Sequence, residues 1–454
     1  MNKNILEVIG NTPLVRLNKV IDTKNEVYAK LEYMNPGGSV KDRIGYYIVE
    51  DAEKRGLLKP NGTIVEATSG NTGVGLALVA TIKGYKSIFV MPDKMSDEKI
   101  RLLRAFGAKV VITPTAVEPD DPRSYYSVSK KIAEETPNAF FANQYHNQIN
   151  PLAHYEITGP EIWKQTQGKI EMFFAGMGTG GTISGIGKFL KEQNKDIKII
   201  GVDPLGSILY ELFKTGNAAT KPKTYKIEGI GEDFKPTALH FEFIDDIIQV
   251  SDKESFTITR RLCKEEGIFA GGSSGSAVTG ALKYLKENDL EGKLAVVILP
   301  DSGSRYLSKI YDDGWMRDNG MFESSDYDKV SDLLRFKGNN EVITVNKMDT
   351  IDSVITKMKD YNVSQFPVVS DGKLVGMVSE TDLMRHVFSD KRNTNKQVGT
   401  VVNINIPTID SEFGLTELYE IISKNNVVIV LEKEKIKGII TKIDIIDYLA
   451  SKSK

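Results

Sequence analysis

Between about residues 60 and 300, short runs of apolar and β-branched residues alternate with longer amphipathic stretches, and this alternation limits the folds open to the chain. The run TIVEA precedes the helical pattern NTGVGLALVATIKG, and EMFFAG precedes GTISGIGKFLKEQ. A strand, a glycine-containing turn and a helix, repeated in that order, predict an α/β fold with helices on the faces of an open sheet. Because the strand-like runs are almost wholly apolar, we expect a sheet that is buried on both sides.

The length and charge of the chain narrow the class of protein. Its 454 residues suggest about three domains. Lys and Arg number 59 against 61 Asp and Glu, a net charge of −2, whereas affinity for nucleic acid needs clustered positive charge. No run reaches the ~18 apolar residues that span a bilayer, and the first residues, with Glu7 and Asn11, do not resemble a signal peptide. We therefore expect a soluble, cytoplasmic protein that binds neither nucleic acid nor membrane, although a small anionic ligand needs only a local site.

Cysteine and histidine are too few and too scattered for a metal centre. Cys263 is the only cysteine, so no internal disulfide can form. The four histidines, His146, His154, His240 and His386, do not have the spacing of zinc ligands. We expect packing or surface roles for them and no bound metal.

The chain is expected to divide into an α/β region at 1–316, a linker at 317–340 and a tandem repeat. The linker segment is polar and has little periodicity except in the short piece DKVSDLLRF. Beyond it, KLVGMVSETDLMRHV and KIKGIITKIDIIDYL share a glycine, two apolar residues, Ser or Thr, and Asp three residues later. Two copies of such a unit predict small paired domains at 341–392 and 393–454 that bury one shared face.

Two turns in the first half of the α/β region carry candidate functional residues. Lys41, in NPGGSVKDR, opens a helix, where the macrodipole disfavours a cation but suits an amine that must be neutral, as in an imine with a carbonyl cofactor. Alternatively, Lys41 is an ordinary lysine whose aliphatic side chain extends into solvent. The turn TSGNT offers hydroxyls, an amide and free N–H groups at a helix start, enough to bind a carboxylate or phosphate, although ordinary capping also explains it.

Two further turns lie in the second half. The cup GTGGT follows an apolar strand and precedes a helix, so its amides can converge on a phosphate. The cup lacks the acidic ribose ligand of a dinucleotide site and the Lys-Ser/Thr of a P-loop. These absences favour a small phosphate-bearing cofactor over a nucleotide. Alternatively, the glycines serve only to let the chain pack closely. Ser273, after Gly271 and Gly272, is explained on its own by helix capping.

Taken together and in this order, the four turns resemble the β-family (fold-type II) of pyridoxal-phosphate enzymes over about residues 4–316. The resemblance implies two open, helix-flanked sheets and pyridoxal 5′-phosphate as cofactor. It implies that Lys41 forms the imine, that Asn71 hydrogen-bonds the 3′-oxygen and that Ser273 pairs with the pyridine nitrogen. The implied phosphate cup is Gly178, Thr179, Gly180, Gly181 and Thr182. The implied clamp on the substrate carboxylate is Thr68, Ser69 and Thr72.

A serine at the pyridine nitrogen has a mechanistic consequence. A neutral hydroxyl does not hold that nitrogen protonated as an aspartate would, so the cofactor is a weaker electron sink. Loss of a β-leaving group then competes well. The resemblance thus implies β-elimination or β-replacement on an amino acid, in which Lys41 takes the Cα proton and later returns it.

Within fold type II, stretches such as GVDPLGSIL and YKIEGIGEDF look most like the cystathionine β-synthases. This likeness implies condensation of L-serine with L-homocysteine to L-cystathionine and water by a homodimer or higher homo-oligomer. It also places Gln144, Tyr145 and Gly229 at the substrate pocket. Some members carry haem on an N-terminal Cys and His; this chain starts close to the core and has only Cys263, so we expect no haem.

The C-terminal tandem resembles a pair of CBS domains, a Bateman module. In such modules the Ser or Thr and the Asp of the shared core contact adenosyl ligands, which implies Ser379, Asp382, Thr441 and Asp444 here. Helix capping explains the same residues equally well. The second copy lacks the proline of QFPVV, so we expect that one of the two clefts can be empty. Three alternatives remain for the ligand: S-adenosylmethionine, AMP or none.

Two other functions stay open at this point. A cysteine synthase that uses O-acetylserine and sulfide would need the same four turns. An adenosyl-ligand sensor with an idle α/β region belongs to a different class, and the presence of all four turns argues against it.

Overall fold

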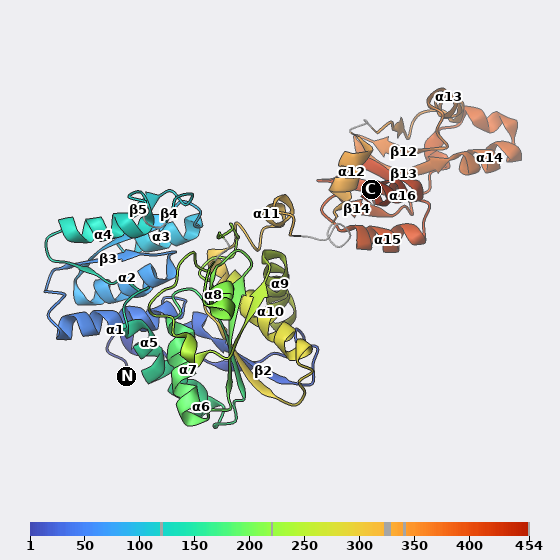
Figure 1. Cartoon of the computed structure of the whole chain (residues 1–454). Coiled ribbons are helices and arrows are strands. Elements are labelled where there is room, and N and C mark those ends of the chain that lie inside the picture. Colours follow the sequence, from blue (N-terminus) through green and yellow to red (C-terminus); the bar gives the residue numbers. More distant parts are fainter. Residues whose placement is uncertain (119–120, 219–220, 322–327, 339–341, 453–454) are drawn as a thin grey trace. The chain divides into compact units, whose positions relative to one another are not determined.

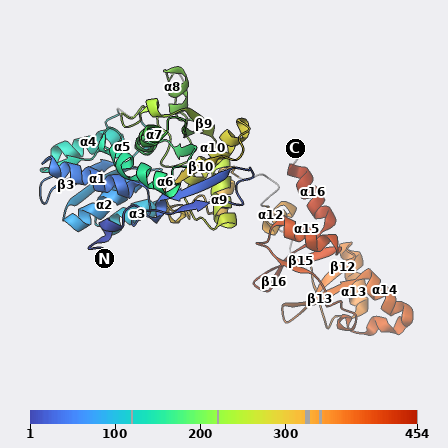
Figure 2. The same cartoon turned by 90° about the horizontal axis from the view of Figure 1, so that it is seen from below.

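The computed structural model describes residues 1–118, 121–218, 221–321, 328–338 and 342–452. It contains two compact units, Met1–Met321 and Phe322–Lys454, which Figures 1 and 2 show from two directions.

The first unit is built on two sheets. The six-stranded sheet has the order β1-β2-β10-β7-β8-β9 and is parallel except for β1. Its strands are β1 (Leu14–Arg16), β2 (Glu26–Leu31), β7 (Met172–Gly176), β8 (Lys198–Pro204), β9 (Asp246–Val250) and β10 (Leu294–Leu299). The four-stranded sheet is wholly parallel in the order β5-β4-β3-β6. Its strands are β3 (Thr63–Ala67), β4 (Lys86–Pro92), β5 (Lys109–Thr113) and β6 (Ala139–Phe141).

Helices connect the strands of this unit. The longer ones are α1 (Lys41–Lys54), α2 (Asn71–Lys83), α3 (Asp97–Ala105), α4 (Tyr125–Glu135), α7 (Gly181–Gln193), α9 (Asp252–Glu266) and α10 (Gly272–Glu287). Shorter helices are α5 (Ile149–Ala153), the π-helix η3 (His154–Thr158), α6 (Gly159–Gln165), α8 (Leu209–Thr215) and α11 (Asp313–Asp318). Single 3₁₀ turns are η1 (Ile5–Val8), η2 (Glu32–Met34), η4 (Phe241–Phe243) and η5 (Gly303–Arg305). Local sequence sets several boundaries: α9 begins with a Ser251–Glu254 capping box and ends at Gly267 in the left-handed conformation.

The six-stranded sheet is buried on both faces, as its apolar strands predicted. Phe174 of β7 packs into one core with α9 and α10, whereas its neighbour Phe173 packs into another with α6 and α7. Figures 1 and 2 show these helix pairs on opposite sides of the strands. Successive side chains of a strand point to opposite faces, so two cores need apolar residues at every position. The predicted α/β class, with two helix-flanked sheets, is confirmed.

The second unit contains two copies of one motif, each with a three-stranded sheet. The first copy has β11 (Val345–Asn346), α13 (Ile351–Tyr361), β12 (Gln365–Ser370), β13 (Lys373–Ser379), α14 (Glu380–Ser389), and the 3₁₀ turns η6 (Lys391–Asn395) and η7 (Val398–Thr400). The second has β14 (Thr408–Asp410), α15 (Leu415–Ser423), β15 (Val427–Glu432), β16 (Lys435–Thr441) and α16 (Lys442–Lys452). Strands from both copies share a cluster that includes Met377 and Ile429, so the copies bury a common face.

The segment predicted to be a linker contains a packed helix. Helix α12 (Val330–Lys337) buries Val330 and Leu333 in the core of the second copy, together with Tyr448. The sequence VSDLLRFK, which belongs to the one periodic piece of the predicted linker, is amphipathic at helical spacing. Residues 322–327 and 339–341 of the expected linker lie outside the described residues.

Candidate active site

The carboxyl ends of strands from both sheets surround one cavity of about 660 Å³. The turn after β3, the turn after β7 and the residues after β10 all meet there. Ligands of open α/β sheets bind at this edge, because helix N-termini and polar loops gather there. Twelve of the predicted site residues line the cavity: Lys41, Ser69, Asn71, Thr72, Gln144, Tyr145, Gly178, Thr179, Gly180, Thr182, Gly229 and Ser273.

Lys41 is the first residue of α1 and its side chain faces this cavity. The turn before it is fixed by Gly38, which has φ +79°, and by a hydrogen bond of 2.8 Å from Val40 N–H to Pro300 O. Burial lowers the pKa of the Lys41 amine to about 8, against the opposing effect of the Glu232 carboxyl. A substantial neutral fraction near physiological pH is what an amine needs to attack a carbonyl carbon.

Helices α1 and α2 touch through glycines. A Cβ on Gly45 would lie 2.5 Å from the carbonyl carbon of Gly75, and a Cβ on Gly75 would lie 2.5 Å from the carbonyl oxygen of Lys41. Real side chains do not come this close to backbone atoms, so only glycine fits at either place. The contact sets the separation between the starts of the two helices, where Lys41 and Asn71 lie.

The glycine cup begins helix α7. Gly180 has φ +80°, and a Cβ on Gly178 would lie 2.7 Å from Gly229 O, so the cup and the 228–232 loop are in close contact. Thr179 Oγ1 accepts a hydrogen bond from Asn150 at 3.0 Å, and Thr182 Oγ1 lies 3.2 Å from His154 Nε2. The first N–H groups of a helix have no partner within the helix, so this rigid cup presents donors to an anion.

Two predicted residues do not line the cavity. Thr68 is fully buried, and its Oγ1 accepts hydrogen bonds from Gly70 N–H at 2.9 Å and Gly73 N–H at 3.3 Å. Gly181 packs against the Asn150 side chain. Thr68 shapes the turn that carries Ser69 and Asn71.

Asn71 is held by residues that the sequence reasoning missed. Its Nδ2 donates to Asp301 Oδ2 at 2.8 Å, and its Oδ1 accepts from Arg305. Arg305 also donates to Gly37 O, and Tyr306 donates to Asp301 Oδ2 at 2.6 Å. The available signal was the polar PDSGSR directly after β10, at the edge where the other turns meet.

The remaining predicted contacts form a polar wall. Thr72 Oγ1 donates to Gln144 Oε1 at 2.5 Å, and Gln144 Nε2 donates to Ala67 O at 3.0 Å. The hydroxyls of Tyr145 and Tyr125 are 3.0 Å apart. Ser273 is 3% exposed, and its hydroxyl makes no hydrogen bond to another described residue, so it is available to the cavity.

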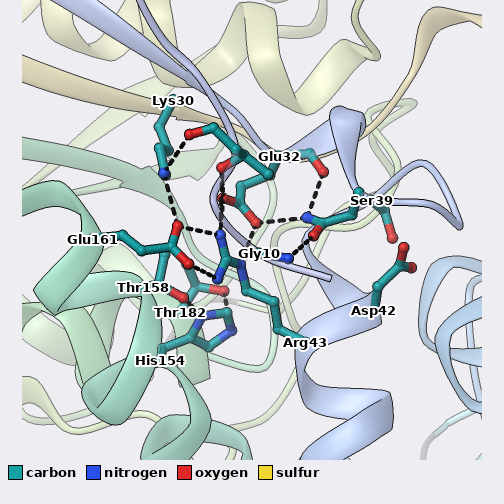
Figure 3. A network of polar contacts seen from close by, with 12 residues as sticks. Gly10, Lys30, Glu32, Ser39, Asp42, Arg43, His154, Thr158, Glu161 and Thr182 are labelled. Carbon is teal, nitrogen blue, oxygen red and sulfur yellow. Dashed lines mark hydrogen bonds and ion pairs between the residues drawn. The ribbon is translucent and has the colours of Figure 1, made fainter. Parts of the chain in front are cut away.

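A buried ion network anchors helix α1 two residues beyond Lys41 (Figure 3). Arg43 donates to Glu32 at 2.7 Å and to Glu161 at 2.8 Å, and Lys30 donates to Glu161 at 2.9 Å. Two cations face two carboxylates, which stabilises charges that would be costly if buried alone. Although burial opposes it, the charge of Arg43 keeps the pKa of Glu32 below its usual range.

In the second unit the four predicted ligand contacts act as caps. Ser379 N–H and Oγ donate to Asp382 Oδ2 at 3.0 and 2.6 Å, and Thr441 N–H and Oγ1 donate to Asp444 Oδ2 at 2.7 and 2.6 Å. Asp444 Oδ2 also accepts from Lys337 of α12 at 2.9 Å.

A cavity of about 600 Å³ lies between the copies. It is lined by Arg335 and Lys337 of α12, Val342 and Ile343 near the first copy, and the segment 437–439 of the second. None of the four capping residues lines it.

Comparison with known proteins places these observations in a family. The profile of the family described as pyridoxal-phosphate dependent enzyme matches residues 5–301, and the CBS domain profile matches 330–389 and 398–451. The chain is 42% identical to the cystathionine beta-synthase of Dictyostelium discoideum, over 98% of this chain and 92% of that protein. The chain belongs to the cystathionine β-synthase family of pyridoxal-phosphate-dependent enzymes.

Two other relatives match the first unit of this cystathionine β-synthase family member. A cysteine synthase of Staphylococcus aureus is 45% identical over 67% of this chain and 95% of its own length. A crystal structure of a hydrogen sulfide-producing enzyme from Fusobacterium nucleatum superposes with a TM-score of 0.63 at 39% identity, covering 68% of this chain and all of that one. The fold-type II class is therefore confirmed, together with the CBS pair.

The residues around the cavity fit pyridoxal phosphate, the cofactor of this family. A buried amine with lowered pKa, a rigid glycine cup at a helix N-terminus and a free serine hydroxyl face one space of sufficient volume for it. Among the described residues, no group of three or more His, Cys, Asp and Glu side chains could hold a metal ion. Across the same ranges, no helix has both the length and the apolar character that crossing a bilayer demands.

Proposed function

We propose that the chain condenses L-serine with L-homocysteine to give L-cystathionine and water. The observation that carries this proposal is the position of Lys41, whose amine shares a cavity with the glycine cup, Asn71 and Ser273. The curated relative from Dictyostelium discoideum, which matches almost the whole chain, bears the name of this activity.

Bound pyridoxal phosphate supplies an electron sink that stabilises negative charge at the substrate Cα. The chain's own residues do the rest. The N–H groups of the cup bind the phosphate, Asn71 takes the ring oxygen and Ser273 the ring nitrogen. Ser69, Thr72 and Gln144 bind the substrate carboxylate and orient the Cα–H bond. Lys41 Nζ removes the Cα proton and, after the new bond has formed at Cβ, returns it.

The test is product analysis with two substrate pairs. Purified enzyme with bound cofactor is given serine plus homocysteine, or O-acetylserine plus sulfide, and products are identified by mass spectrometry. We expect cystathionine from the first pair at the higher kcat/KM. Cysteine from the second pair, with no cystathionine from the first, would refute the proposal.

The second pair represents the other candidate function, a cysteine synthase. The similarity to the Staphylococcus aureus cysteine synthase supports it for the first unit. The match covers almost all of that protein but only 67% of this chain. It therefore gives no counterpart for the CBS pair.

For the CBS pair we propose an adenosyl ligand, with AMP and S-adenosylmethionine as the candidates. The pairing of two CBS domains supports this, and Arg335 and Lys437, which line the cavity between the copies, can bind a phosphate. Calorimetry on the whole protein tests it, and binding that leaves activity unchanged would remove a regulatory role.

We further propose a cytoplasmic homodimer without haem. Light scattering on the purified protein tests the oligomeric state, and the absence of a Soret band tests the haem prediction. Cys263 lies within α9 and is partly buried.

A further inference from the structure

Glu232 carries a carboxyl group in the candidate active site, and the proposed reaction assigns no role to it. It lines the same cavity as Lys41 and Ser273. Its backbone is fixed on both sides, because its N–H donates to Ser207 Oγ at 3.1 Å and its C=O accepts from Ile208 N–H at 3.0 Å. The side chain therefore enters the cavity from a rigid position.

The carboxyl of Glu232 lies among aromatic hydroxyls. Tyr126 donates to its Oε2 at 3.3 Å, and Tyr126 packs edge-on against Tyr145. Within the described part of the chain, no lysine or arginine forms an ion pair with Glu232. Other charged or titratable groups close enough to affect it or be affected by it are Lys41, Lys94, Tyr125, Tyr225, Asp203 and Asp233.

This environment keeps a proton on Glu232. Burial and the nearby Asp233 raise the pKa of Glu232 to about 8, against the weaker opposing effects of Tyr126 and Lys94. The carboxyl is therefore mostly neutral at neutral pH and close to the pKa at which a group both donates and accepts protons.

The other carboxyl groups around the cavity are less suited to this role. Glu228 is ionised, since Lys99 and Lys309 bind it at 2.7 and 2.8 Å. Arg123 lowers the pKa of Asp121 to about 2. Glu118 and Asp233 are exposed to solvent. Among the described carboxyl groups that line the cavity, Glu232 is the one that is partly buried and forms no ion pair with a lysine or arginine.

Glu232 and Lys41 line the same cavity, which adds an argument from position. Lys41 has to reach the substrate Cα, and the carbon that loses its hydroxyl is bonded directly to Cα. Glu232 raises the pKa of the Lys41 amine when it is ionised, and both side chains line the same cavity.

We propose that Glu232 exchanges protons with the groups that leave and enter at the substrate Cβ, an assignment that rests on the proposed condensation. When the C–O bond of serine breaks, Glu232 gives its proton to the departing oxygen, which leaves as water. The carboxylate then takes the thiol proton of homocysteine as the sulfur bonds to Cβ, and Glu232 is protonated again. Lys41 removes and returns the Cα proton, so serine and homocysteine give cystathionine and water.

The test uses Glu232→Gln in the enzyme with bound cofactor, because glutamine keeps the shape and cannot give up an acidic proton. We expect turnover of serine with homocysteine to fall by about 10²- to 10⁴-fold. Release of chloride from β-chloroalanine needs no proton on the leaving group, so it should stay within about threefold of wild type. Exchange of the serine Cα hydrogen with solvent deuterium, the step of Lys41, should likewise persist.

Two further variants sharpen the comparison. Glu232→Asp should restore part of the serine turnover, with a shifted pH profile, because it keeps an acid at the position. Glu118→Gln removes an exposed carboxyl at the rim of the same cavity and should leave all three rates unchanged.

Two results for Glu232→Gln would overturn the assignment. Serine turnover by Glu232→Gln within about threefold of wild type would do so, and so would a parallel loss of chloride release and Cα exchange, which marks a structural role. Wild-type enzyme that makes no cystathionine from serine instead refutes the condensation itself. Should Glu232→Gln fail to fold, infrared spectroscopy of the cofactor-free wild type and Glu232→Asp decides, since a Glu232 carboxyl already ionised at neutral pH contradicts the proposal.

Discussion

Asn71 and Asp301, 230 positions apart in the chain, are joined by a hydrogen bond of 2.8 Å from Asn71 Nδ2 to Asp301 Oδ2. Asn71 opens α2 beside the four-stranded sheet, and Asp301 follows β10 of the six-stranded sheet. The bond therefore couples the two sheets at the place where the cofactor's ring is proposed to lie. It also fixes which way the amide of Asn71 points.

Replacing this carboxylate should damage both stability and cofactor binding. Asp301→Ala leaves Asn71 Nδ2 and the Tyr306 hydroxyl without an acceptor, which should lower the free energy of unfolding by about 1–3 kcal/mol. Urea unfolding and titration with pyridoxal phosphate measure the two effects. Asp22→Ala, at an exposed position, is the control, and equal stability of the two variants would contradict the prediction.

Lys41→Ala should abolish covalent capture of the cofactor. The purified variant should lack the visible absorbance of lysine-bound pyridoxal phosphate, and turnover should fall by at least about 10²- to 10⁴-fold, since the Cα proton loses its acceptor. Absorbance spectra and steady-state kinetics check this. A variant that keeps the absorbance band shows that another amine binds the cofactor.

Cofactor capture should depend on pH in a defined direction. Only the neutral amine attacks an aldehyde, and the pKa of Lys41 is lowered to about 8, so the rate of reconstitution should rise with pH and level off above about 8. Glu232, whose pKa is about 8, raises the Lys41 pKa once it is ionised, so Glu232→Gln should shift the upper part of the curve to lower pH. Stopped-flow absorbance on cofactor-free protein gives the profile; a rate still rising steeply toward pH ~10, the range of an ordinary lysine, disagrees with a buried amine.

The ion network beyond Lys41 should be essential for folding. Arg43→Leu leaves Glu32 buried without its main partner, which should cost about 3–5 kcal/mol of unfolding free energy. Arg55→Leu removes an exposed arginine at the end of the same helix and should change stability by less than about 1 kcal/mol. Thermal and denaturant unfolding compare them, and similar losses in both would remove the special role of the network.

Lys337 should compete with an adenosyl ligand for Asp444. Lys337→Ala frees the carboxylate, so AMP should bind to the second copy up to about fivefold more tightly, the size expected from a partly exposed ion pair. Lys437 lines the same cavity as Lys337 but pairs with Glu432. Lys437→Ala should therefore not tighten binding. Calorimetry measures both, and a loss of AMP affinity in Lys337→Ala would show that the lysine itself binds the ligand.

Local patterns were sufficient to predict the layers of the fold and the four turns. Apolar runs predicted strands buried on both faces, and Lys41 and the cup at Gly178 lie at helix starts as expected. The prediction that turns more than a hundred residues apart form one site came from the family resemblance and not from the local sequence patterns. Its residue roles stay predictions.

Long-range partners could not be read from one sequence. Asp301 and Arg305 contact Asn71 only because two sheets meet, and Glu232 acquires its pKa from burial that no linear motif encodes. The two hydrogen bonds that Thr68 accepts from the N–H groups of its own turn could not be predicted either. The packing of α12 could not be predicted, because its core contacts belong to the second copy. Several of these contacts lie more than 80 residues downstream of Val330.

The contact between Gly45 and Gly75 has a consequence for how this enzyme can vary. One extra carbon atom at either position would push two helices apart and carry the reactive amine away from the turn that opens α2. The tolerance of the chain to mutation should therefore be lowest where it has no side chain at all, and a mutational scan should find these two positions as intolerant as Lys41.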